Sequence, residues 1–182
     1  RHVRQLTFGG ENAEAYFSFD GKKLIFQSTR PPFTADQMFT MNIDGSDVRL
    51  VSTGKGRCTC GFWSPDGKKI LYSSTDWYSA EPPPPPDRSQ GYVWGLFPYR
   101  LFMANADGSE RVALTDGDAY NAEGSFHPRG DRVLFTTTRW GNIDLAEVNL
   151  RPKRIRRLTT EIGYNGGPFY SWDGRSSVYR AY

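Results

Sequence analysis

The sequence predicts an all-β fold built from repeated four-stranded antiparallel sheets, which is the arrangement of a β-propeller. Composition is the first indication: of 182 residues, 27 are aromatic, 19 are glycine and 12 are proline, a bias typical of strands and turns. The second is a strand–turn–strand pattern that recurs four times along the chain. No segment of ten or more residues keeps a helical period, so we expect no helix.

The recurring pattern is a short aromatic strand, a two-residue turn and a second strand that alternates apolar and polar residues. An aspartate or arginine before a glycine forms each turn, and such pairs suit tight hairpins because they tolerate positive φ. The turn glycines lie 46, 63 and 44 residues apart. The four copies occupy residues 15–30, 61–75, 124–139 and 168–182.

A second hairpin follows each of the first three copies, at residues 37–52, 100–115 and 145–159. Two of these turn on Asp-Gly-Ser, and the third on Leu150-Arg151-Pro152. Residues 3–7 match the last strand of these hairpins, so a leading strand is expected there. A β-sandwich also has strands every 8–12 residues, but it does not require the same two turns in the same order. We therefore predict a single propeller domain over residues 1–182, with blades at about 12–53, 54–115 and 116–159 and a partial blade at 160–182.

These repeats resemble the TolB-like, WD40-like PD40 family of propellers. The best copy of the family motif is Phe62-Trp63-Ser64-Pro65-Asp66-Gly67-Lys68, and Asp-Gly-Ser turns follow as the family pattern requires. Other copies depart from it: Phe19 and Trp172 replace the proline, and His127 begins a Pro-Arg-Gly variant. The resemblance implies a ring of six or more blades that acts as a binding platform, in many members in the periplasm.

The predicted strands do not complete such a ring. The chain also begins at Arg1 rather than methionine, so we expect a processed product or part of a larger propeller. The alternative is a four-bladed ring, in which the leading strand and the final hairpin form an incomplete fourth blade. An open ring would leave strand edges that invite association.

Charge and motif content exclude several classes of function. The formal net charge is only +3, which argues against nucleic-acid binding through bulk electrostatics. Mean hydropathy is −0.62, and neither a transmembrane segment nor a signal-peptide pattern is evident. No motif for a nucleophile elbow, zinc protease, phosphate loop or calcium loop is present, so we expect no catalytic residue, metal or cofactor. His127 stands where other copies have serine, which favours a turn residue over a general base.

Cys58 and Cys60 project from the same face of a predicted strand. Their Cα atoms would lie about 6.6 Å apart, at the outer limit for a disulfide. Metal binding would need two further soft ligands that the sequence does not offer. Free buried thiols are the favoured interpretation.

The loops on one face of the predicted ring carry irregular, charged sequence. If the first strand of each blade lines the channel, Glu14 and Glu123 should point toward its mouth. Arg30 and Arg139 begin loops on the same rim. Two interpretations remain open: these charges pair between blades, or they contact a ligand or partner.

The long spacing between the second and third turns marks an insertion at residues 76–99. Pro82 to Pro86 favour a stiff polyproline arm, and long loops with their own aromatics are usually functional or docked. Such aromatics could contact a partner or fold back on the rim. The candidate contact residues are Trp77, Tyr78, Tyr92, Trp94 and Phe97.

Taken together, the sequence predicts a non-catalytic propeller that binds a protein partner, and an accessory subunit of a larger extracytoplasmic complex is one form that this function would take. The alternative is a substrate-gating propeller attached to a hydrolase, because prolyl-oligopeptidase-like enzymes carry similar repeats. A full reading frame with a catalytic domain would favour the second.

Overall fold

A computed structural model describes residues 2–89, 91, 93 and 95–182 of the chain. It contains three four-stranded antiparallel sheets and one two-stranded sheet, each formed by consecutive strands. No helix occurs among the described residues. Because every sheet is a meander of neighbouring strands, the predicted blade pattern and the all-β fold are confirmed.

The strand bounds follow the repeats closely. The first sheet contains β1 (Glu11–Phe17), β2 (Lys23–Thr29), β3 (Gln37–Asn42) and β4 (Arg49–Leu50). The second contains β5 (Cys58–Trp63), β6 (Lys69–Ser74), β7 (Arg100–Asn105) and β8 (Val112–Ala113). The third contains β9 (Asn121–Phe126), β10 (Arg132–Thr137), β11 (Asp144–Leu150) and β12 (Lys153–Arg157), and the last is the hairpin of β13 (Asn165–Tyr170) and β14 (Ser177–Ala181).

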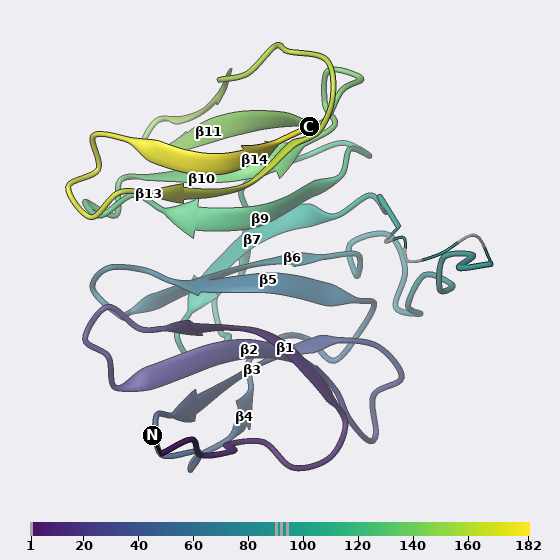
Figure 1. The fold of residues 1–182 in the computed structure, drawn as a ribbon, viewed down its shortest axis with the longest axis vertical. Coiled ribbons are helices and arrows are strands. Elements are labelled where there is room, and N and C mark those ends of the chain that lie inside the picture. The colour runs from purple at the N-terminus through teal and green to yellow at the C-terminus, as the bar shows by residue number, and fades with distance from the viewer. Residues whose placement is uncertain (1, 90, 92, 94) are drawn as a thin grey trace.

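The first sheet lies at the bottom of Figure 1, the second in the middle, and the third at the top, where the hairpin of β13 and β14 overlaps it in this view. The first strands of neighbouring sheets contact each other, β1 with β5, β5 with β9 and β9 with β13. Three aromatic rings from three sheets meet along this inner line: the centroids of Tyr16, Phe62 and Phe169 are 5.5–5.9 Å apart. The first strands therefore line the inner side of the arc.

Apolar side chains between adjacent sheets form the core. One cluster joins the first and second sheets through Ile25, Met38, Trp63 and Phe102. Another joins the second and third through Leu71, Leu101, Phe126 and Phe135. The alternating strand pattern places these residues on the faces that stack, which is how propeller blades bury a continuous core.

The first hairpin of each blade has a wider turn than predicted. Gly21, Gly67, Gly130 and Gly174 do have positive φ, but the residue before each of them does not. In the second blade the Gly67 N–H donates to the Ser64 carbonyl at 2.9 Å, and the Ser64 hydroxyl donates to Asp66 at 2.6 Å. The serine and aspartate thus stabilise a longer loop than two residues, because their side chains replace backbone hydrogen bonds.

Residues 3–7 do not form the predicted leading strand. Their pattern matches the outer strand of a blade, but a strand needs a ladder partner, and none of the described strands pairs with them. Instead Leu6 lies against Gly45, whose position would bring a Cβ within 3.2 Å of the Leu6 carbonyl oxygen. The interpretation of residues 3–7 as a strand was therefore wrong for this structure.

Replacing Gly67 by valine should lower the free energy of unfolding by about 1–3 kcal/mol, because a β-branched residue is strained at positive φ. The φ of Gly67 is +67°, and a Cβ there would meet nothing within 4 Å, so backbone strain alone sets the cost. Urea unfolding checks this, with Lys68→Val in the same turn as the control, expected within about 0.5 kcal/mol of wild type. An unchanged midpoint for Gly67→Val would contradict the turn geometry.

Candidate functional site

The inner strands share a β-bulge at the same position, and these bulges build the candidate site. In each of β1, β5, β9 and β13 two residues oppose one residue of the next strand. The first bulged residue has positive φ in all four: Glu14, Cys60, Glu123 and Gly167. Bulges re-aim side chains, and here they aim three side chains at the channel.

Side chains from the preceding blade hold three of the four bulges, at Cys60, Glu123 and Gly167, in place. The Cys60 N–H donates to Gln27 Oε1 at 3.2 Å, the Glu123 N–H faces the Cys60 sulfur, and the Gly167 N–H donates to Glu123 Oε2 at 2.8 Å. A buried N–H without a partner is costly, so this chain of contacts stabilises the positive-φ backbone and fixes the channel residues.

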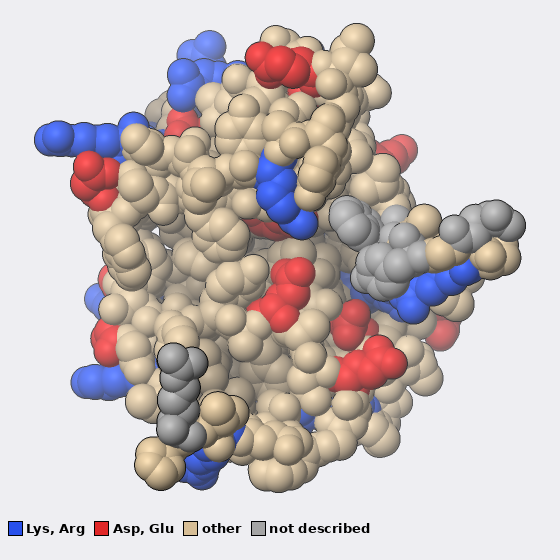
Figure 2. All heavy atoms as spheres, viewed as in Figure 1, with Lys and Arg blue, Asp and Glu red and all other residues tan. Residues whose placement is uncertain are grey.

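Two adjoining cavities flank the bulges. The outer one is about 280 Å³ and includes Gln27, Arg57, Thr59, Tyr99 and Phe97 in its wall. The inner one is about 420 Å³ and includes Tyr16, Phe62 and Phe169. Both share Glu14, Cys60, Glu123 and Arg180. In Figure 2 acidic side chains gather in the middle of this face, between the first sheet and the final hairpin.

Glu123 is the most heavily hydrogen-bonded acid in the site. Its carboxylate accepts from the Thr136 hydroxyl at 2.7 Å and from the Gly167 N–H. The Tyr164 hydroxyl donates to it at 3.3 Å, and Arg180 forms an ion pair with it at 3.4 Å. These donors come from the third sheet and the final hairpin, so Glu123 links two blades.

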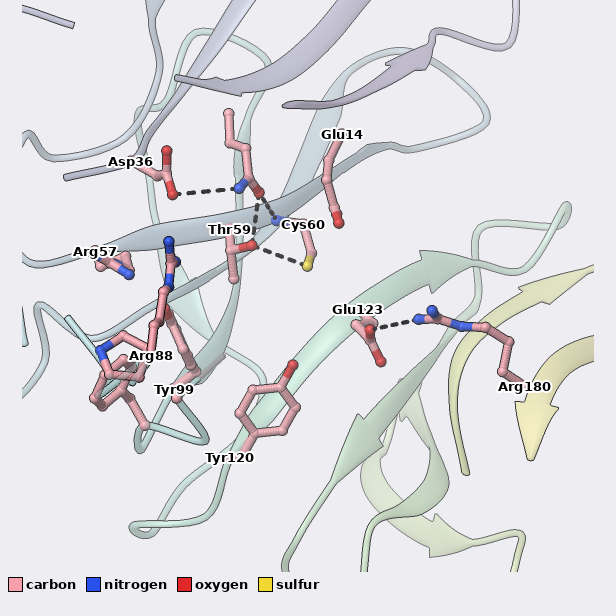
Figure 3. A pocket seen from close by; sticks show the side chains of 14 residues that line it. Glu14, Asp36, Arg57, Thr59, Cys60, Arg88, Tyr99, Tyr120, Glu123 and Arg180 are labelled. Carbon is pink, nitrogen blue, oxygen red and sulfur yellow. Dashed lines mark hydrogen bonds and ion pairs between the residues drawn. The ribbon is translucent and has the colours of Figure 1, made fainter. Parts of the chain in front are cut away.

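Glu14 differs from Glu123 because it has no cation within salt-bridge distance among the described residues. Burial raises the pKa of its carboxyl, and the like charge of Glu123 raises it further, while the Cys60 thiol and Arg180 partly oppose this. Figure 3 shows the Glu14 side chain pointing into the cavity opposite Glu123. Its charge is therefore available to something that enters the channel.

Cys60 is a buried free thiol at the boundary of the two cavities, and Cys58 is also free and buried, as the sequence favoured. Burial raises the pKa of Cys60 well above its ordinary value, and the charges of Glu14 and Glu123 add to this. Burial also raises the pKa of Cys58, to about 12. Both sulfurs are thus protonated thiols at neutral pH, a poorly nucleophilic form.

Arg30 and Arg139 lie away from Glu14 and Glu123, although the sequence placed all four on one rim. Arg30 donates to Asn12 at 2.8 Å and lies over the Phe39 ring at 4.9 Å. Arg139 pairs with Asp116 in the loop before β9. Pairing between blades does occur, but the arginine that reaches Glu123 is Arg180.

The ends of the insertion are docked on the second blade. Trp77 donates from its indole nitrogen to the Pro98 carbonyl at 2.7 Å, and Arg100 lies 3.6 Å from its ring. Phe97 packs with Tyr99 and lines the outer cavity. Tyr78 is 44% exposed. The predicted contact residues Tyr92 and Trp94 lie outside the described residues.

The described part of the insertion projects beside the channel mouth, at the right of Figure 1. Pro86 and Arg88 belong to the wall of the outer cavity together with Phe97. The sequence named Phe97 as a candidate contact, but it did not single out Pro86 or Arg88.

Sequence reasoning missed Arg57, Cys60 and Arg180 as channel residues. A signal was present for Cys60, since it aligns with Glu14, Glu123 and Gly167 in the four repeats. A glycine in one copy of a repeated slot indicates positive φ in the others. Arg180 gave no such signal, because its contact with Glu123 spans 57 residues.

Comparison with known proteins agrees with this architecture. The Tol-Pal system protein TolB of Ruthia magnifica subsp. Calyptogena magnifica is 28% identical to the chain over 147 residues, which is 79% of this chain and 30% of that protein. The crystal structure of TolB from Acinetobacter baumannii matches 93% of this chain and 37% of its own with a TM-score of 0.73, at 16% identity. The chain has a TolB-like β-propeller fold.

The TolB-like resemblance predicted from the motifs is thus confirmed at the level of fold. Dipeptidyl-peptidase 5 of Porphyromonas endodontalis is also similar, at 34% identity over 82 residues, 45% of this chain and 12% of that protein. No family model matches the chain. The TolB-like chain spans less than a third of the length of either of these two curated relatives.

Two further findings concern binding and membranes. Among the described residues, no group of three or more histidine, cysteine or acidic side chains is arranged to hold a metal ion. Within the same part of the chain, no helix has the length and apolar character needed to cross a membrane.

Proposed function

We propose that this chain is a non-catalytic TolB-like propeller segment that binds a protein partner through its channel mouth and the adjacent insertion. The observation that carries the proposal is the insertion itself: both ends are docked, and Pro86 and Arg88 between them line the cavity at the channel mouth. A segment held at both ends loses less conformational freedom on binding than a free loop, which favours affinity. Its polyproline run adds stiffness.

The proposal includes an accessory role in a larger complex outside the cytoplasm. The resemblance to the Tol-Pal system protein TolB supports this location, because many TolB-like chains are periplasmic. The chemistry of the channel supports binding rather than catalysis. Cys60 is a neutral thiol, Glu123 is occupied by donors from two blades, and His127 is used in a turn, where its Nδ1 accepts from the Arg129 N–H at 3.1 Å.

Deleting residues 79–90 and joining the ends with a short Gly-Ser linker should leave the fold intact while weakening partner capture by about tenfold or more. The anchors Trp77 and Phe97 stay, and shortening a loop changes closure entropy by less than about 1 kcal/mol. Quantitative affinity capture from envelope extracts of the source organism measures the binding, and circular dichroism measures the fold.

A matched control replaces Pro82 to Pro86 with five Gly or Ser residues, which keeps the length and removes the stiffness. We expect an intermediate loss of capture for this variant. Equal recovery of partners by wild type and the deletion would reject the insertion as the contact. Loss of the β signal would show that the insertion is instead a structural cap.

The second candidate is the propeller portion of a larger peptidase. The similarity to Dipeptidyl-peptidase 5 favours it. An assay of the full natural polypeptide with dipeptide p-nitroanilides distinguishes the two functions. Hydrolytic activity that copurifies with the protein supports the peptidase, and no release of p-nitroaniline supports the binding module.

A further inference from the structure

The channel mouth has two unpaired charges of opposite sign. Glu14 and Arg57 both line the outer cavity, and neither forms an ion pair within the part of the chain that the structure describes. In Figure 3 Arg57 lies on one side of the cavity with Arg88, and Glu14 lies on the other with Glu123 and Arg180.

The other charges of this cavity already have partners. Glu123 pairs with Arg180. Asp36 accepts from the Thr29 hydroxyl at 2.8 Å and from Gln27 at 3.5 Å. Arg88 also takes part in an interaction. Asp36, like Glu14 and Arg57, forms no ion pair among the described residues, but its carboxylate is already hydrogen-bonded by these two neutral side chains, the threonine and the glutamine. We therefore take Glu14 and Arg57 as the charges that a ligand would pair with.

The structure fixes the backbone of Arg57 and leaves its side chain unsatisfied. The Arg57 N–H donates to the Thr75 hydroxyl at 2.9 Å, and its carbonyl accepts from the Thr75 N–H at 3.1 Å. Its buried Nε has no hydrogen-bond partner. A buried donor without an acceptor costs free energy, and a carboxylate in the cavity would remove that cost.

Glu14 occupies a position that favours glycine. Its φ is +51°, where the matching position of the final hairpin has Gly167 at +63°. A non-glycine residue in this region is strained, and the bulge directs the glutamate side chain into the cavity. A cation beside Glu14 would stabilise the charged form of its carboxyl, whose pKa is raised by burial and by the like charge of Glu123.

We propose that the channel mouth binds a dipolar segment of a partner polypeptide, with a basic side chain against Glu14 and an acidic side chain against Arg57. Arg57 and Glu14 lie on opposite sides of the outer cavity (Figure 3). Successive side chains of an extended peptide point to opposite faces, so side chains at i and i+3 also face opposite ways and can approach the two sides. The proposal rests on the function proposed above and names the chemistry of its partner.

Inner aromatic rings add an apolar end to this site. Tyr16, Phe62 and Phe169 line the inner cavity behind Glu14. A lysine side chain is long enough to extend from Glu14 toward these rings, and aromatic faces attract ammonium groups. Lysine therefore fits the acidic side of the site better than a short cation does.

The first measurement uses the wild-type chain and four blocked tetrapeptides followed by NMR titration. Acetyl-Lys-Ala-Ala-Glu-amide should bind about three- to tenfold more tightly than the versions in which glutamine replaces lysine or glutamate. The version with both residues replaced should bind weakest. Equal affinity for all four peptides would overturn the proposal without any variant having to fold.

The second measurement assigns each charge. Glu14→Gln should abolish the preference for lysine and leave the preference for glutamate, and Arg57→Gln should do the reverse. Arg139→Gln, outside the cavity, is the matched control and should change neither. A uniform loss with all peptides, at an unchanged melting temperature, would contradict the assignment.

A third measurement tests whether the two charges come from side chains within a polypeptide or from the two ends of a short free peptide. Free trialanine is a zwitterion that carries its opposite charges at the two termini instead of on side chains. Tighter binding of trialanine than of the blocked peptide would overturn the assignment to an internal segment of a partner. If the peptides do not bind but the deletion of residues 79–90 still weakens partner capture, only the present inference is rejected. If the peptides bind but the deletion does not weaken capture, only the proposed contact function of the insertion is rejected.

Discussion

Replacing Arg111 with methionine is expected to lower the free energy of unfolding by about 3–5 kcal/mol, since it leaves a buried carboxylate unpaired. Both terminal guanidinium nitrogens of Arg111 contact the two oxygens of Asp76, at 2.5 Å each. The two side chains are only 18% and 5% exposed. Methionine keeps the length of the stem and its contact with Phe102, so the loss reports the charge. Urea unfolding measures it.

The matched control is Arg49→Met, which breaks a similar ion pair in the first blade. Arg49 contacts Asp47 at 2.7 Å, but these side chains are 69% and 41% exposed. Water solvates both partners there, so we expect a loss of about 1 kcal/mol or less. Equal losses for the two variants would mean that burial does not set the cost of the Arg111 change.

The Arg111 effect should also depend on pH. Burial raises the pKa of Asp76, but hydrogen bonds from Arg111 and Thr53 outweigh it, so the net pKa lies below the ordinary 3.8. A lowered pKa in the folded state stabilises the protein above the unfolded pKa, and this contribution is lost as pH falls through the folded value. The difference between wild type and Arg111→Met should therefore be largest near neutral pH and shrink in acid.

Local chemistry explains why so much of the fold was predictable. Each Ser-x-Asp-Gly turn is stabilised by its own side chains, as when Ser171 donates to Asp173 at 2.6 Å. Such contacts span two residues, so they repeat wherever the motif repeats. His127 replaces the serine with a different local contact, because its Nδ1 accepts the Arg129 N–H two residues on, whereas the serine hydroxyl donates to the aspartate and accepts the N–H five residues on.

Long-range contacts explain what was missed in the site. The bulges at Glu14 and Glu123 leave no break in the strand pattern, and the side chain that holds the Glu123 bulge, Cys60, comes from another blade. Arg180 reaches Glu123 from the final hairpin, whereas Arg30 and Arg139 are used within their own blades. The sequence predicted that charged residues lie on one rim, but it does not predict which of them form ion pairs.

The same limit applies to residues 3–7, which read as an outer strand. Their side-chain pattern is that of β4 and β8, but a pattern does not supply a hydrogen-bonded neighbour. Pairing depends on another strand in three dimensions, and the described strands provide none at this place.

Trp63→Ala is expected to lower the free energy of unfolding by about 3–5 kcal/mol, the usual range for truncating a buried tryptophan. Trp63 is 2% exposed and packs with Ile25 and Met38 of the first sheet and Phe102 of its own. Alanine would leave a cavity between two blades. The surrounding side chains belong to two different sheets, so they can fill this cavity only if a whole sheet moves. Thermal or urea unfolding, with the m-value monitored, measures the loss.

Phe17 supplies the matched control, because it occupies the same position of the repeat in β1. It pairs with Leu24 as Trp63 pairs with Ile70, but it is 65% exposed since no described element covers it. Phe17→Ala should therefore change stability by no more than about 0.5 kcal/mol. If both variants lose a comparable free energy of unfolding, the aromatic residue at this position stabilises mainly its own hairpin. A large loss for Trp63→Ala alone would place it in the contact between blades, which is how the structure uses it.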